Sequence, residues 1–176
     1  MRHVGLFTTR VVLGSYMTVH GVQKLFGSFG GPGLASTATG FGSHGLRPEK
    51  SMAALAGASQ LAGGVLTVAG LGDPLGPMLI AGNMTVASTF LRKQGAMSKN
   101  GGFELPMIYL AAAIGSMSTG SGRLRFGPPL PKALVRICGV AIMGMVVGSL
   151  AQLLRAKPNE RGSSPSTGAE ANNLSQ

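Results

Sequence analysis

The sequence has 176 residues, of which only 11% are charged, while 29 are glycine and none is tryptophan. A soluble domain usually carries about 25% charged residues and about 7% glycine, so the composition argues against a water-soluble fold and favours closely packed helices in lipid. The net charge is +10, but the cations fall between apolar runs and in the tail, which is typical of membrane anchoring and argues against a nucleic-acid partner. The single cysteine, Cys138, excludes an internal dithiol or a thiolate metal cluster.

Three apolar segments in the first half of the chain approach the length that a membrane-spanning helix needs, about 20 residues. The first, residues 4–26, carries Arg10, and this charge interrupts the apolar run where a signal peptide would be continuous. We therefore expect a retained helix. The second, residues 51–71, has no charged side chain, and a tight turn at residues 72–74 separates it from the third, residues 74–91.

The second half of the chain adds two apolar segments, residues 103–119 and 133–154, separated by the helix-breaking stretch 120–131. Residues 27–50 read as a long Gly/Ser/Thr loop that is ordered over the membrane surface or partly re-entrant. The sequence after Ala156 is polar and rich in turn-forming residues, which predicts a disordered tail.

These segments predict an all-α membrane helix bundle. Four spans lie in residues 1–131 and a fifth in residues 132–156, and the polar tail follows in residues 157–176. Four lysines and arginines flank the segments on the side of the N-terminus and nine on the other side. Because cytoplasmic loops carry the excess of cations, this distribution favours a multi-pass protein with a cytoplasmic C-terminus.

Polar side chains within the spans gather at one depth. At a rise of about 1.5 Å per residue, His20, Gln60 and Asn83 lie about 9–14 Å below the cation-rich face. Lys24 follows His20 by four residues and so shares its helical face, and Glu104 begins the fourth span at the same face. Ionisable groups in lipid usually face the interior of a bundle, so these five residues are a candidate polar intramembrane site.

Each of the five residues also has a purely structural explanation. Lys24 can extend its ammonium to the interface, and Glu104 can stabilise a helix N-terminus through the helix dipole. Gln60 and Asn83 can form interhelical hydrogen bonds worth about 0.6–2 kcal/mol each, and His20 can bond to a carbonyl. The sequence leaves both explanations open.

Two other features have structural interpretations. Arg10 lies about 9 Å from the opposite face, and Asp73, in the turn on that side, is its expected partner in a structural ion pair. Small residues spaced four apart, which permit close helix packing, occur at Ala111 and Gly115 and at Gly144 and Gly148. The 10 methionines do not cluster with His or Cys, so we expect no metal site.

Several stretches of the sequence resemble the DoxX family of membrane proteins. "RVVLGSYMTVHGVQKLFGSFGGPG", followed by "FGSHGLRP", is similar to the first helix and loop of that family, and "AGLGDPLGPMLIAGNM" and "NGGFELPMIYLAAA" are similar to its third and fourth helices. The resemblance covers about residues 5–125. Arg10, His20, Gly21, Lys24, Asn83 and Glu104 fall on motif positions.

The sequence departs from the family pattern at two places. Gln60 stands where the family often has a glutamate, and "GSGRLRFG" lacks the aspartate that often ends the fourth helix. These departures put in doubt any proton or quinol chemistry that depends on the missing carboxylates. The family is a four-helix bundle, so the resemblance implies that the fifth span is an addition.

The resemblance implies a bacterial plasma membrane protein with a redox association, because relatives are linked to thiosulfate:quinone oxidoreduction, quinol oxidase subunits and oxidative-stress complexes. On this hypothesis the polar site receives a quinone head group or a small polar substrate, Glu104 relays protons, and His20 and Lys24 stabilise an anionic form. An alternative is a non-catalytic accessory or assembly subunit that packs against respiratory or oxidoreductase partner subunits through the fifth span. A transporter is less well supported, because no matching pair of interrupted helices is visible.

Overall fold

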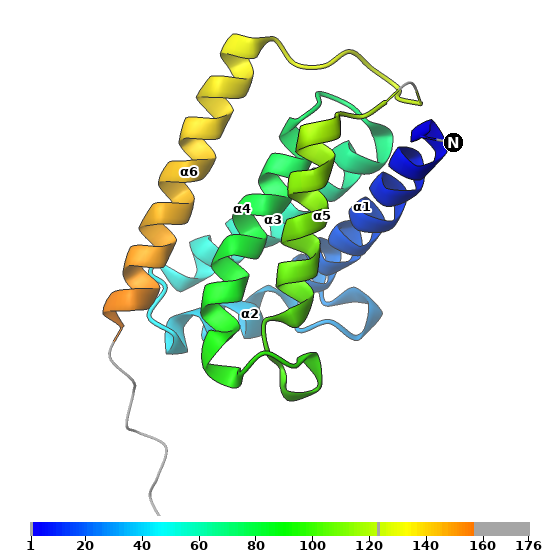
Figure 1. Cartoon of the computed structure of the whole chain (residues 1–176). Helices are drawn as coiled ribbons and strands as arrows, with labels where there is room; N and C mark the ends of the chain where they lie inside the picture. The colour runs from blue at the N-terminus through cyan, green and yellow to red at the C-terminus, as the bar shows by residue number, and fades with distance from the viewer. Residues whose placement is uncertain (1, 123, 157–176) are drawn as a thin grey trace, which may run out of the picture.

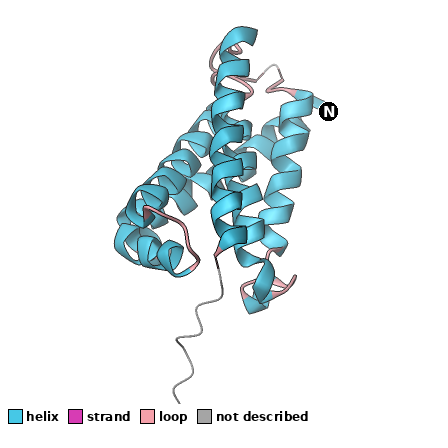
Figure 2. Ribbon diagram, turned by 90° about the vertical axis from the view of Figure 1, so that its left-hand side faces the viewer, coloured by secondary structure: helices cyan, strands magenta, loops and turns pink. Residues whose placement is uncertain are grey.

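The computed structural model describes residues 2–122 and 124–156, and this part of the chain is helical with no strand (Figure 1, Figure 2). The expected all-α class is confirmed. The α-helices are α1 (Arg2–Phe26), α2 (Gly33–Ser43), α3 (Glu49–Ala69), α4 (Leu75–Leu91), α5 (Glu104–Thr119) and α6 (Lys132–Arg155). The tail predicted for residues 157–176 lies outside the described residues.

The long helices alternate in direction, so that successive connections lie at opposite ends of the bundle. The N-terminus, the turn between α3 and α4, and the stretch leading to α6 share one end in Figure 1, while α2 and the connection between α4 and α5 lie at the other. Two helices, α3 and α6, are long and apolar enough to cross a membrane. With 17 residues, α4 stands at the short end of the about 17–25 residues that a span needs, and α5, with 16, is one residue below it.

The segment between the first two expected spans is not the long loop that its composition predicts. It contains the 11-residue helix α2, which packs mainly against α3 and also contacts α1. Thr37 and Ala38 are the buried residues of this helix. The glycines of this segment suggest a loop, but burial of one face against α3 compensates for their poor helix propensity.

The closest helix approach in the bundle joins α1 and α3 at glycines. A Cβ atom built on Gly21 would lie 2.5 Å from the backbone nitrogen of Leu61 and 2.8 Å from the carbonyl oxygen of Gly57. A Cβ atom on Gly64 would lie 2.6 Å from the carbonyl oxygen of Gly14. Real Cβ atoms do not approach other atoms so closely, so the two backbones are in contact because these positions carry no side chain.

The small residues singled out in α5 and α6 do not serve this purpose within the described residues. Cβ atoms built on Gly115, Gly144 and Gly148 would meet no atom within 4 Å, and Ala111 is exposed. These positions therefore point away from the bundle, and the close packing occurs at glycines of α1 and α3 instead.

Arg10 connects three parts of the bundle through backbone carbonyls. Its Nε donates to Thr67 O at 3.0 Å and its Nη2 to Val68 O at 2.9 Å, both in the last turn of α3. Its Nη1 donates to Ser121 O at 2.5 Å and to Leu124 O at 2.8 Å, in the stretch after α5. The Arg10 side chain is only 3% exposed, and it binds carbonyls in the last turn of α3 and in the non-helical stretch after α5.

The direct ion pair expected between Arg10 and Asp73 is not formed, although the structure describes both side chains. Asp73 Oδ2 instead accepts the backbone N–H of Ser121 at 3.1 Å. Ser121 thus uses its carbonyl for the arginine and its N–H for the carboxylate. The ion pair does not form because the guanidinium already donates to fixed backbone carbonyls at the end of α3.

The glycine crossing predicts that Gly21→Ala destabilises the protein. The added methyl group must push the backbones of α1 and α3 apart, and overpacking of this kind typically costs about 1–3 kcal/mol. Thermal unfolding of the purified protein in detergent measures the effect. Gly148→Ala, at an open position in α6, is the matched control and should leave the midpoint nearly unchanged; equal midpoints for the two variants would contradict the crossing.

Arg10→Met should also destabilise the protein, because it leaves buried carbonyls without a donor. Hydrogen bonds to a charged group are worth about 1.5–3 kcal/mol each, so we expect the unfolding midpoint to fall by about 5–10 °C. Arg136→Met, at an exposed position of α6, controls for loss of positive charge. A similar fall in both variants would show that net charge, and not carbonyl binding, sets the stability.

Candidate functional site

The site begins with a contact between α1 and α3. Lys24 Nζ donates to Gln60 Oε1 at 2.8 Å, and Gln60 is only 2% exposed. The contact follows from the glycine crossing, because Lys24 lies one turn after Gly21 and its Cβ is near the position that a side chain on Gly57 would take. Among the described residues no carboxylate lies within 4.0 Å of the ammonium, so the partner of this cation is a neutral amide.

A cavity of about 280 Å³ lies beside this contact, between α2, α3, α4 and α6. Its walls are mostly apolar, and its polar lining residues are Lys24, Ser59, Asn83 and Ser149. Asn83 Nδ2 donates to Ser59 Oγ at 2.7 Å and to Leu79 O at 3.1 Å. Lys24 and Asn83, predicted from depth alone, therefore line one cavity, and Gln60 holds the lysine at its edge.

The structure does not bring His20 or Glu104 into this cavity. His20 turns toward α5, where its ring meets the edge of Tyr109 with a centroid distance of 6.2 Å. Glu104 is exposed, and its Oε2 accepts the backbone N–H of Ser98 at 2.9 Å. Glu104 is the first residue of α5, and its bond to Ser98 holds the connection between α4 and α5 against the start of that helix. The proton-relay role considered for this carboxylate has no support in its position.

Sequence reasoning missed an aromatic group beside the cavity. His44 stacks on Phe90 with a ring-centroid distance of 4.0 Å, and Phe41 lies 5.6 Å from Phe90. Phe41 and Phe90 both line the cavity. The signal was the "FGSH" of residues 41–44, an aromatic and a histidine at near-helical spacing, in a segment interpreted as loop. Ser59, adjacent to Gln60, was missed as well.

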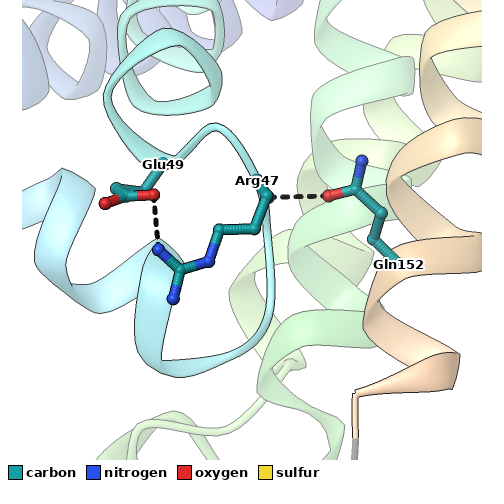
Figure 3. Close-up of polar contacts among 3 residues, drawn as sticks. All are labelled: Arg47, Glu49 and Gln152. Carbon is teal, nitrogen blue, oxygen red and sulfur yellow. Dashed lines mark hydrogen bonds and ion pairs between the residues drawn. The ribbon is translucent and has the colours of Figure 1, made fainter.

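A polar contact attaches α6 near the cavity. The backbone N–H of Arg47 donates to Gln152 Oε1 at 2.7 Å, and the Arg47 guanidinium pairs with Glu49 at 2.7 Å (Figure 3). The connection between α2 and α3 is thereby joined to the last turns of α6. This contact fixes the end of the wall that α6 contributes to the cavity.

The arrangement suits recognition of one polar head group in apolar surroundings. An ammonium with a neutral partner has N–H donors left for a carbonyl or an anionic oxygen. Mostly apolar walls with a few placed polar groups are the usual construction of a small-molecule site. Among the described residues no group of three His, Cys, Asp or Glu side chains could hold a metal ion.

Comparison with known proteins identifies the family. The sequence profile of the DoxX family matches residues 5–93, which span α1 to α4 and include Lys24, Gln60 and Asn83. No curated protein and no solved structure matches the chain at a significant level. The match extends over half of the 176 residues. The chain therefore belongs to the DoxX family of membrane proteins.

Proposed function

We propose that this protein is a quinone-linked membrane subunit that holds a quinone head group in the cavity beside Lys24. The observation that carries the proposal is the pairing of an ammonium with only a neutral amide, at the edge of an apolar cavity. A quinone offers what this site lacks, a carbonyl acceptor on an apolar ring. When bound, it would supply electron- and proton-carrier chemistry.

The donors of the site fit such a head group. Lys24 Nζ uses one hydrogen for Gln60, so it can donate another to a quinone carbonyl. Ser59 and Asn83 lie on the α3 and α4 walls and supply further polar atoms. The volume of about 280 Å³ is near the lower limit of ligand pockets, about 300–1,000 Å³, which suits one ring and excludes a bulky molecule.

The described residues include no pair of cysteines and no metal-binding group, so in this proposal the electrons come from a partner oxidoreductase subunit. Lys24 binds and orients the head group, Gln60 fixes the lysine, and the apolar walls exclude water. We further propose a multi-pass protein of the bacterial plasma membrane, with a four-helix core to which α6 is added.

One observation favours a second function, that of a non-catalytic accessory subunit. The outer face of α6 is exposed and apolar, and Gly144 and Gly148 on it have open space around them. A helix of a partner subunit would approach closely there. In this case the partner carries the redox centres, and the cavity holds a structural lipid.

Lys24→Met should remove the bound quinone. Loss of a hydrogen bond from a charged donor, worth about 1.5–3 kcal/mol, corresponds to at least about a tenfold loss of affinity. The measurement is the quinone content per protein, extracted after purification in mild detergent. Lys99→Met, an exposed lysine outside the cavity, is the control and should retain the quinone.

Two results would contradict the proposal. One is equal quinone content in Lys24→Met and the unaltered protein, with helix content preserved in both. The other is an unaltered protein that carries no quinone and copurifies with a redox subunit, which is the result that the accessory function predicts.

A further inference from the structure

The wall that α6 contributes to the cavity packs against a neighbouring long helix on one side only, and its C-terminal end is joined to the connection between α2 and α3. Ile142, Met145, Val146 and Ser149 line the cavity and lie along one face of α6. This helix packs along α4, where a Cβ atom on Gly82 would lie 2.8 Å from Ile142 Cγ2. Across the cavity, α3 has no comparable packing against α6. The cavity is therefore closed by helix contact toward α4 and lacks such closure toward α3.

Two residues that line the cavity are also exposed, and they mark where it reaches the surface. Leu55 of α3 is 42% exposed and Met145 of α6 is 43% exposed. Both belong to helices that are long and apolar enough to cross a membrane. The opening thus lies between two such helices, α3 and α6, and Figure 2 looks at the bundle from the side of α6.

The chemistry changes from the interior of the cavity to this opening. Lys24, Ser59 and Asn83 supply polar atoms and are half-buried, whereas the exposed lining residues Leu55 and Met145 are apolar. An apolar opening gives a hydrated polar ligand no groups that replace the water it loses. An apolar mouth between membrane helices instead faces acyl chains.

We propose that the cavity opens laterally into the bilayer between Leu55 and Met145, and that its ligand is a membrane-resident quinone whose isoprenoid chain lies in this opening. The inference rests on the proposed function. It adds that the quinone carries an isoprenoid chain and that it enters the cavity from the bilayer. The volume supports it, because about 280 Å³ holds a head group but no long chain, so the chain must continue outward.

The test uses the full chain in lipid nanodiscs and two probes that share a head group. One probe is coenzyme Q with its full isoprenoid chain, and the other is dimethoxy-methyl-benzoquinone, which has no chain. Met145→Trp narrows the opening, and Val147→Trp places the same side chain on the outer face of α6, where Val147 is exposed. We expect Met145→Trp to weaken coenzyme Q binding at least about fivefold, to change benzoquinone binding less than about twofold, and Val147→Trp to change neither.

The outcomes separate the two proposals. Equal weakening of both probes by Met145→Trp, or none of either, overturns the lateral opening while quinone binding stands. Failure of the unaltered protein to bind either probe overturns the quinone function and the opening with it. If Met145→Trp reduces the yield of folded protein, Leu55→Phe on the opposite side of the opening replaces it, with the same expected difference between the probes.

Discussion

The structure depends on one close contact, the approach of α1 to α3 at Gly14, Gly21, Gly57 and Gly64. Lipid gives apolar helices no hydrophobic reason to associate, so dispersion between closely packed backbones must hold them together. The same contact builds the site. It brings the turn after Gly21 against the turn after Gly57, and Lys24 thereby meets Gln60. A larger side chain at either glycine would separate donor from acceptor as well as helix from helix.

Two cations of α1, Arg10 and Lys24, differ in how many of their N–H donors have partners. Arg10 donates to four backbone carbonyls and joins α3 to the stretch after α5, so its donors are largely used. Lys24 has one neutral side-chain partner and borders a cavity. Both were expected to be costly in lipid and therefore to face inward. Arg10 is buried and Lys24 is half-buried, and the two also differ in the number of N–H donors that remain without a protein partner.

The sequence predicted what length, hydropathy and helical rise determine. The five long helices lie where the apolar segments do. Counting residues from the helix ends predicted one site of His20, Lys24, Gln60, Asn83 and Glu104; of these, Lys24, Gln60 and Asn83 lie at or beside one cavity, while His20 and Glu104 do not line it. The sequence could not predict which small residues pack, because the spacing in α6 looks like any other packing motif. Nor could it predict the partners of Arg10, since backbone carbonyls at a helix end have no signature in the sequence. The glycines of residues 27–50 concealed α2 and, with it, the aromatic group beside the cavity.

The position of α6 relative to the family match bears on specificity. Residues 5–93 supply Lys24, Ser59 and Asn83, which are the groups that we propose bind a polar head group. The fourth wall comes from Lys132–Arg155, beyond the matched region. The polar interior thus belongs to the family-matched part of the chain, while the apolar boundary is set by a helix outside it. Ser149 is the buried residue of α6, so this helix forms the apolar boundary with side chains that are half-buried or exposed.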